Sequence, residues 1–296
     1  MNTGILIIII IAAVLAVLIA ACVLRSRAEV KCLETARYEL HSDKLKDGQN
    51  IRMVFISDLH GREYGDDNVQ LVETVRQEHP DFILVGGDLL VLKNEAKDAN
   101  ARAFIRSISK IAPIYYAPGN HEKGMMTLKK FRTRKRNYLN FLRSESVKYL
   151  SNETVQESGS ISITGLDIDY TYYDKLHPQK MTDQAMSSYL GKLDKNRYNI
   201  VLAHNPEYFG LYCLNEPDLV LAGHFHGGAI RLPLVGGVIS PQFRLFPKYS
   251  RGCFIKGKTT MIVSAGCGSH TINLRVFNKP EVVVIDLKPA EYPGKR

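Results

Sequence analysis

Ile51-Arg52-Met53-Val54-Phe55-Ile56-Ser57-Asp58-Leu59-His60 is a short apolar run that leads directly into a carboxylate and an imidazole. Residues 51–57 have the length and the apolar, partly β-branched content of a buried strand. On an extended chain the side chains at positions i and i+2 point to the same side, so we expect Asp58 and His60 to face one point. The stretch therefore predicts a sheet strand with polar groups gathered at its carboxyl end.

Outward from this strand, apolar runs of strand length alternate with segments of helical periodicity. Helices are expected over 68–78 and 96–111. Further strands are expected over 81–86, 113–117, 160–165, 199–203, 219–222, 259–264 and 281–287. This alternation predicts an α/β layered domain with a central mixed sheet, and one soluble domain over 51–296 is the simplest division of the chain.

Residues that can bind metal follow four more of these apolar runs. They are Asp88, Asn120, His121, His204, His224 and His226. Five of the nine histidines of the chain stand directly after an apolar run, beside Asp, Asn or Gly. Because ligands bind at the carboxyl ends of the strands in α/β sheets, this placement predicts one shared site.

In chain order the blocks read DxH, GD, GNHE, H and GHxH, and this ordered set resembles the calcineurin-like metallophosphoesterase superfamily. The matching region runs from Met53 to about His226. The resemblance implies a two-sheet β-sandwich flanked by helices, with two divalent metal ions in its site.

The resemblance also implies a role for each residue of the blocks. It matches one metal to Asp58, His60, Asp88 and His226, and the other to Asp88, Asn120, His204 and His224. Asp88 then bridges the two metals. His121 matches the catalytic histidine, which is not a ligand.

These donor types suit the implied chemistry on physical grounds. Mixed carboxylate, amide and imidazole donors favour Mn, Fe or Zn over Ca. Two cations about 3.5–4 Å apart lower the pKa of a shared water and withdraw charge from phosphate oxygens, so that a metal-bridged hydroxide attacks phosphorus. His121, as an imidazolium, is expected to protonate the leaving alkoxide. The implied enzyme is a metal-dependent hydrolase of phosphoric ester bonds.

The rest of the chain distinguishes between branches of this superfamily. Ser/Thr protein phosphatases carry GDxxDRG, whereas Asp88 is followed by Leu89-Leu90-Val91-Leu92. The GHxHGG block, residues 230–233 and Tyr249-Ser250-Arg251-Gly252 resemble a membrane-anchored bacterial branch. That branch resembles phosphodiesterases and pyrophosphohydrolases, including some that act on UDP-diacylglucosamine.

We therefore expect a phosphodiester or pyrophosphate bond in a small-molecule or lipid-linked substrate. The candidates for phosphate contacts are Arg231, Arg251 and Arg275, each of which could instead be ordinary surface charge.

The segment from Gly4 to Leu24 holds 21 residues without a charge, a helix of roughly 30 Å. We expect residues 1–24 to be an uncleaved transmembrane anchor and residues 25–50 to be a polar linker. A cleaved signal peptide, or lipidation at Cys22 in the lipobox-like Ile19-Ala20-Ala21-Cys22, is the alternative. Basic residues at 25, 27 and 31 follow the apolar run, so the positive-inside rule favours a single-pass cell-membrane protein with a cytoplasmic catalytic domain.

The chain is basic, with 39 Lys+Arg against 30 Asp+Glu, which favours anionic partners. Eight Lys/Arg and no Asp/Glu lie between Lys123 and Arg143. This segment is a solvated helix face, a guide for anionic substrate or a contact for acidic lipid. Nucleic acid is disfavoured by the lack of aromatic interleaving and of a DNA-binding motif, so a nuclease and a non-catalytic metal-dependent scaffold are the weaker alternatives.

Overall fold

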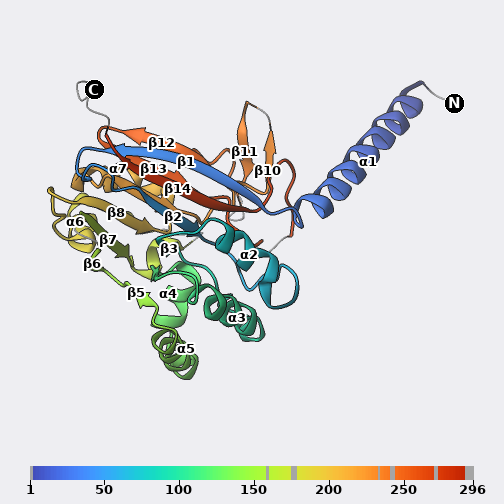
Figure 1. Ribbon diagram of the computed structural model, residues 1–296. Helices are drawn as coiled ribbons and strands as arrows, with labels where there is room; N and C mark the ends of the chain where they lie inside the picture. Colours follow the sequence, from blue (N-terminus) through green and yellow to red (C-terminus); the bar gives the residue numbers. More distant parts are fainter. Residues whose placement is uncertain are drawn as a thin grey trace.

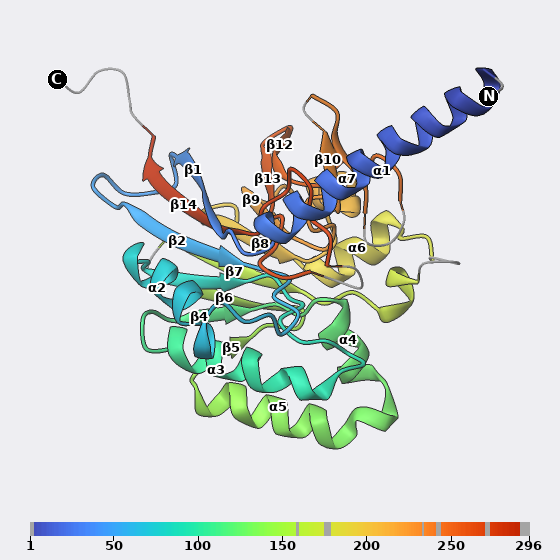
Figure 2. The ribbon, with the colours of Figure 1, turned by 90° about the vertical axis from the view of Figure 1, so that its right-hand side faces the viewer.

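The computed structural model describes residues 3–157, 160–174, 179–232, 234–240, 244–269 and 273–290. Two six-stranded sheets pack face to face with helices on their outer faces, and one long helix projects from the domain (Figures 1 and 2). Pro233, which belongs to the sequence resemblance, lies outside the described residues.

The first sheet has the strand order β1-β14-β2-β3-β4-β5. Its strands are β1 (Glu34–Ser42), β14 (Glu281–Pro289), β2 (Ile51–Ile56), β3 (Phe82–Val85), β4 (Ile114–Tyr116) and β5 (Lys148–Tyr149). The strands β2 to β5 are parallel, while β14 runs antiparallel to β2 and parallel to β1. The carboxyl ends of β2, β3 and β4 therefore reach the same edge of the sheet.

The second sheet has the order β12-β13-β9-β8-β7-β6. Its strands are β12 (Gly252–Lys256), β13 (Thr259–Val263), β9 (Leu219–Ala222), β8 (Tyr198–Ala203), β7 (Ile161–Leu166) and β6 (Glu153–Glu157). The four central strands are parallel, and the two edge strands are antiparallel to their neighbours. A separate hairpin, β10 (Ile230–Leu232) and β11 (Gly236–Ile239), follows β9.

Helices cover both outer faces of the sandwich. The first sheet carries α2 (Val69–Gln77), α3 (Asp98–Ile108), α4 (Asn120–Thr127) and α5 (Arg132–Ser144), and the second carries α6 (Asp183–Leu190) and α7 (Phe209–Tyr212). Single 3₁₀ turns lie at Asp66–Asn68, Glu95–Lys97, Lys129–Phe131, Tyr170–Tyr173, Pro206–Tyr208 and Cys213–Asn215.

Alternate residues of β2 enter different cores. Met53 and Phe55 pack between the two sheets, whereas Val54 and Ile56 pack against α2 and α3. Because side chains alternate along a strand, a strand buried on both faces is apolar throughout, which is how the deciding stretch reads. A third core joins the second sheet to α6 and α7, so the domain has four layers.

The expected strands and helices are all present, with ends that differ by a few residues at most. The expectation of one central sheet, drawn from the alternation of strands and helices, is wrong, because the strands divide between two mixed sheets. The two-sheet sandwich that the resemblance implied is confirmed.

The expected linker over 25–50 is also wrong, because β1 pairs with β14 from Glu34↔Glu281 to Ser42↔Pro289. Only the face that carries Ala36, Tyr38 and Leu40 packs on the core. The sequence of this edge strand therefore looks like that of a polar linker.

Helix α1 (Thr3–Glu29) is exposed along its apolar part and is long and apolar enough to cross a membrane. It continues past the apolar run, where Arg25 and Glu29 pair at 2.8 Å across one turn. Its last turn is fixed to the domain, since the backbone N–H of Arg275 donates to Oγ of Ser26 and that of Asn278 donates to the Glu29 carboxylate.

Candidate metal centre

Loops from both sheets meet at the edge reached by the carboxyl ends of β2, β3, β4, β8 and β9. In the first sheet, β2 leads into Asp58 and His60, β3 into Asp88, and β4 into Asn120 and His121 at the start of α4. In the second sheet, β8 leads into His204, and β9 into His224 and His226. All of these residues are buried or half-buried. The structure thus brings together the Asp and His residues that the sequence matched to the two metals.

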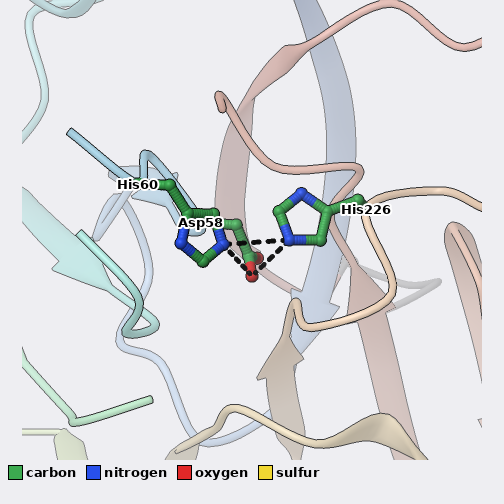
Figure 3. Close-up of side chains that lie close together, drawn as sticks. All are labelled: Asp58, His60 and His226. Atoms are coloured by element: carbon green, nitrogen blue, oxygen red, sulfur yellow. Dashed lines mark hydrogen bonds and ion pairs between the residues drawn. The ribbon is translucent and has the colours of Figure 1, made fainter. Parts of the chain in front are cut away.

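Asp58, His60 and His226 form the first cluster of donors (Figure 3). Nε2 of His60 lies 3.1 Å from Nε2 of His226, and Oδ1 of Asp58 lies 3.4 Å from Nε2 of His226. Two imidazoles and a carboxylate that converge on one point are a ligand set for a divalent transition metal.

Asp88, His204 and His224 form the second cluster. Nε2 of His204 lies 3.2 Å from Oδ2 of Asp88 and 3.2 Å from Nδ1 of His224. The same Oδ2 lies 3.9 Å from Nε2 of His60, which belongs to the first cluster. Asp88 therefore stands between the two clusters, where one carboxylate could be shared by two cations.

Asn120 lies in the chain between two residues that contact Asp88 of the second cluster. Its Oδ1 is buried and has no hydrogen-bond partner among the described residues. The residues on either side of it touch Asp88, because the N–H of His121 donates to Oδ1 of Asp88 at 2.8 Å and a Cβ on Gly119 would lie 2.2 Å from that oxygen. An unsatisfied buried oxygen costs about 1–3 kcal/mol, which a bound cation would offset. The donor set therefore fits divalent metal ions.

Backbone carbonyls orient two of the histidines. The carbonyl oxygen of Gly86 lies 2.7 Å from Nδ1 of His204, and that of Gly268 lies 3.4 Å from Nδ1 of His226. A ring nitrogen that faces a carbonyl carries the proton, so Nε2 of each ring keeps its lone pair for a metal.

His121 is held differently from the other histidines. The backbone N–H of Leu92 donates to Nδ1 of His121 at 2.8 Å. Because Nδ1 accepts this bond, the ring proton lies on Nε2 and the ring is neutral. The imidazolium that the sequence suggested does not fit this contact, since it would set two N–H groups against each other.

The loops that carry the donors turn at the donors themselves. Left-handed backbone occurs at Asp58 (φ 53°), His60 (φ 49°), Asp88 (φ 55°), His224 (φ 71°) and His226 (φ 50°). Residues other than glycine rarely adopt this conformation, and where they do the surrounding structure imposes it, often at functional sites. The expectation that Asp58 and His60 project from an extended chain is therefore wrong, although both side chains reach the same point.

Burial and close charges shift the pKa values of these groups. Burial raises the pKa of the Asp58 carboxyl to about 6, against the opposing effect of His204. Burial also acts to raise the pKa of Asp88, but His204 outweighs it and holds that pKa well below its usual value. For His204 burial favours the neutral ring, yet Asp88 overcomes it and raises the pKa to about 10. Without a cation, the site holds protons that metal ligands must release.

Glu122 joins two of the loops, a role that the sequence did not reveal. Its buried carboxylate accepts hydrogen bonds from the backbone N–H groups of Asp88 (2.7 Å), Leu90 (3.0 Å) and Gly119 (3.0 Å) and from the Tyr116 hydroxyl (2.8 Å). Burial, with Asp88 adding to it, raises the pKa of Glu122 to about 7. Glu122 contacts loop backbone here, so it positions the donors of two strands relative to each other.

The three candidate arginines lie in different surroundings. Arg275 is buried, and its guanidinium donates to the carbonyl oxygens of four residues, Ala265, Gly266, Gly268 and Asn278. Arg251 pairs with Glu34 and Glu281. Arg231 donates to the carbonyl of Gly227 and to Oγ of Ser250. The structure does not place Arg275 where it could contact a substrate, whereas Arg231 and Arg251 line an open pocket.

The basic segment from Lys123 to Arg143 forms α4, a 3₁₀ turn and α5. Arg134 within it is buried, pairs with Asp98 at 2.6 Å and donates to the carbonyl of Leu92, so part of its charge is structural. In both views α5 lies at the end of the domain away from α1 (Figures 1 and 2). That position does not favour contact between α5 and a membrane crossed by α1.

Comparison with known proteins agrees with this geometry. The family model for calcineurin-like phosphoesterase matches residues 51–228, more than half of the chain. An uncharacterized metallophosphoesterase of Aquifex aeolicus (strain VF5) is 28% identical, with the alignment covering 89% of this chain and 95% of the relative. Phosphodiesterase YaeI of Escherichia coli (strain K12) is 25% identical, with the alignment covering 80% of this chain and 82% of YaeI.

Among solved structures, TT1561 of Thermus thermophilus superposes with a TM-score of 0.47 at 14% identity, covering 74% of this chain and 91% of its own. The family match extends from β2 to the turn after His226 and so contains all of the clustered Asp and His donors. The chain therefore belongs to the calcineurin-like phosphoesterase family and is a metal-dependent hydrolase of phosphoric esters.

Proposed function

We propose that the protein is a membrane-anchored, dinuclear-metal hydrolase of phosphodiester or pyrophosphate bonds. The observation that supports it most is the position of Asp88, whose Oδ2 lies 3.2 Å from Nε2 of His204 and 3.9 Å from Nε2 of His60, one histidine from each cluster. A carboxylate between two sets of donors is what a pair of cations requires.

In this proposal each cation has four protein ligands. Asp58, His60, Asp88 and His226 would hold one, and Asp88, Asn120, His204 and His224 would hold the other. The buried Oδ1 of Asn120, which has no partner among the described residues, supports its inclusion in the second set. When bound, the two cations supply Lewis acidity that activates water and neutralises charge on the phosphoryl oxygens.

In this proposal His121 donates a hydrogen bond to the leaving group. The Leu92 N–H occupies Nδ1 and leaves Nε2–H as the group that can face the substrate. The His121 side chain is 13% exposed, so it can be reached from solvent while its orientation is fixed. We assign its Nε2–H to the leaving oxygen of the phosphoester, to which it donates a hydrogen bond that stabilises the negative charge as the bond to phosphorus breaks. The neutral ring keeps this proton, and water protonates the leaving oxygen.

The surroundings of this site support a class of substrate. Leu92, which contacts His121, stands where the GDxxDRG motif of protein phosphatases has its arginine, and the residue before it is not an acid. The similarity to a protein named a phosphodiesterase supports a diester. The last turn of α1 is also close to the site, because Asn278 donates hydrogen bonds both to the Glu29 carboxylate and to the backbone carbonyl of His226. A lipid-linked phosphodiester or pyrophosphate suits a centre so close to the anchor, and the basic residues after Leu24 favour a cytoplasmic location.

The test compares Mn-dependent hydrolysis of bis-p-nitrophenyl phosphate and p-nitrophenyl phosphate by the full chain in detergent. We expect the diester to be cleaved with the higher kcat/KM, and His121→Ala to abolish most of that activity. A preference for the monoester would contradict the proposed bond class. Equal activity of wild type and His121→Ala would contradict the role of His121.

A further inference from the structure

The described surface outside α1 exposes few large apolar side chains, and most of them gather in one place. The gathered residues are Leu232, Leu234, Val235, Leu245, Phe246 and Phe277, which we call the hairpin patch. The others are Val69, Leu128, Leu214 and Ile255. Leu234 is fully exposed and Phe246 is 60% exposed. A soluble surface rarely gathers so many exposed apolar side chains unless they meet another apolar phase.

The hairpin patch is built from three segments that pair with one another. Leu232, Leu234 and Val235 belong to the β10–β11 hairpin and its turn. The N–H of Phe246 donates to the carbonyl of Val238 on β11, and the neighbour of Phe277, Val276, forms a bridge to Ile230 on β10. The patch is therefore one surface.

This surface is continuous with the last turn of α1. The Arg25 guanidinium lies 3.7 Å from the centre of the Phe277 ring, and the backbone of Arg275 bonds to Ser26. In both views the β10–β11 hairpin and α1 project from the same side of the domain (Figures 1 and 2). A membrane that surrounds the apolar part of α1 would thus meet the hairpin first.

Basic side chains border the patch. Arg231, Lys248 and Arg251 line the same 620 Å³ pocket as Leu234, Phe246 and Phe277. Apolar side chains rimmed by lysine and arginine are typical of surfaces that lie in the headgroup region of an anionic bilayer.

We propose that the hairpin patch is a second membrane contact, which dips into the headgroup region beside α1. The hairpin begins four residues after His226, and Arg231 at its base donates to the carbonyl of Gly227. The contact therefore holds the metal centre at the bilayer surface. The membrane contact deepens the proposed function, because it gives a lipid-linked phosphoester a short path to the metal centre. The purpose of the contact rests on that function, whereas its existence does not.

The sequence contains no tryptophan, so a single introduced tryptophan reports its own surroundings. The probe is Leu234→Trp in the full chain, reconstituted in phosphatidylcholine–phosphatidylglycerol vesicles with or without shallow doxyl-labelled phosphatidylcholine. Phe246→Trp is a second probe in case the first does not fold. The matched control is Leu214→Trp, since Leu214 is also exposed but lies away from α1. The residues that follow it, Asn215 and Glu216, line a pocket with Ser42, which is at the end of β1 opposite α1.

We expect both patch probes to emit at shorter wavelength than the control and to be quenched by the doxyl lipid at least about twofold more strongly. Emission and quenching equal to those of Leu214→Trp would overturn the proposal. A shorter wavelength without lipid quenching would also overturn it, since it would indicate a second copy or another protein on the patch. Fluorescence and quenching do not depend on catalysis. A protein without phosphoesterase activity whose patch probes are still quenched would therefore contradict the proposed function but not the membrane contact.

Discussion

Nδ1 of His121 accepts a hydrogen bond of 2.8 Å from the backbone N–H of Leu92. The donor is a main-chain group five residues after Gly87, so no side-chain motif encodes it. It fixes the ring as the neutral Nε2–H tautomer, with Nε2 4.0 Å from Oδ2 of Asp88. His121 is thereby positioned as a neutral hydrogen-bond donor, without an acidic partner on Nδ1.

Replacement of His121 by Ala should lower kcat for a phosphodiester by about 100- to 1,000-fold, the usual contribution of one hydrogen-bond donor to charge that develops in the transition state. The metal content should not change, since Nδ1 is occupied and the ring is assigned no metal. His121 does, however, lie in a third possible donor group with His60 and Asp88. Steady-state kinetics and metal analysis of the same preparation, with exposed His41→Ala as control, separate these roles: loss of a metal ion would make His121 a ligand.

Asn120→Ala should weaken binding of one of the two metal ions by about 10-fold or more. It should not destabilise the metal-free protein, because the buried Oδ1 has no hydrogen bond to a described residue that could be lost. Mn titration and thermal unfolding in EDTA provide the two measurements. A fall in Tm in EDTA, with Mn affinity unchanged, would mean that Asn120 has only a structural role.

Metal affinity should increase with pH. In the metal-free fold the pKa of His204 is raised to about 10 by Asp88, against burial, so a proton must leave His204 before it can bind a cation. Each proton released strengthens the apparent affinity about tenfold per pH unit below that pKa. Below about pH 6, where burial has raised the pKa of Asp58, a second proton steepens the dependence. Mn titrations between about pH 5.5 and 8.5 check this, and an affinity independent of pH would contradict it.

Arg275→Ala should destabilise the protein by about 3 kcal/mol or more, since it leaves four buried carbonyl oxygens without their donor. The matched control is Arg106→Ala, an exposed pair with Glu145, for which about 1 kcal/mol or less is expected. Urea unfolding of the detergent-solubilised proteins compares them. Unchanged stability with a raised KM would instead restore Arg275 as a substrate contact.

Removal of β1 should destabilise the domain more than removal of the apolar part of α1. A fragment of residues 25–296 keeps Ser26, Glu29 and all of β1, whereas a fragment of residues 44–296 exposes the whole edge of β14. We expect the first to unfold cooperatively and the second to aggregate or to lose several kcal/mol of stability. Equal stability of the two fragments would show that residues 25–43 are a linker after all.

The parts that could be predicted from the sequence are those encoded locally. Strands buried on both faces, such as β2, read as continuous apolar runs, and the donors stand directly after them. The edge strand β1 was missed because only one of its faces is buried, and that burial depends on pairing with β14 at the other end of the chain.

The details of the site could not be predicted for a similar reason. The left-handed backbone at Asp58 and His60 and the contact of Leu92 with His121 depend on how loops pack, which residue types do not record. Arg275 resembled a phosphate contact because burial is invisible in a short motif. Its partners are backbone carbonyls, which have no sequence signature.

The most direct test of the two-metal centre is to count the metal ions bound to the full chain, after saturation with Mn and removal of free metal, by inductively coupled plasma mass spectrometry. We expect about two ions per chain for the wild type, about one for His226→Ala, and fewer than one for Asp88→Ala, since Asp88 is the ligand shared by both sites. One ion per wild-type chain, or two in Asp88→Ala, would contradict a pair of metals bridged by Asp88.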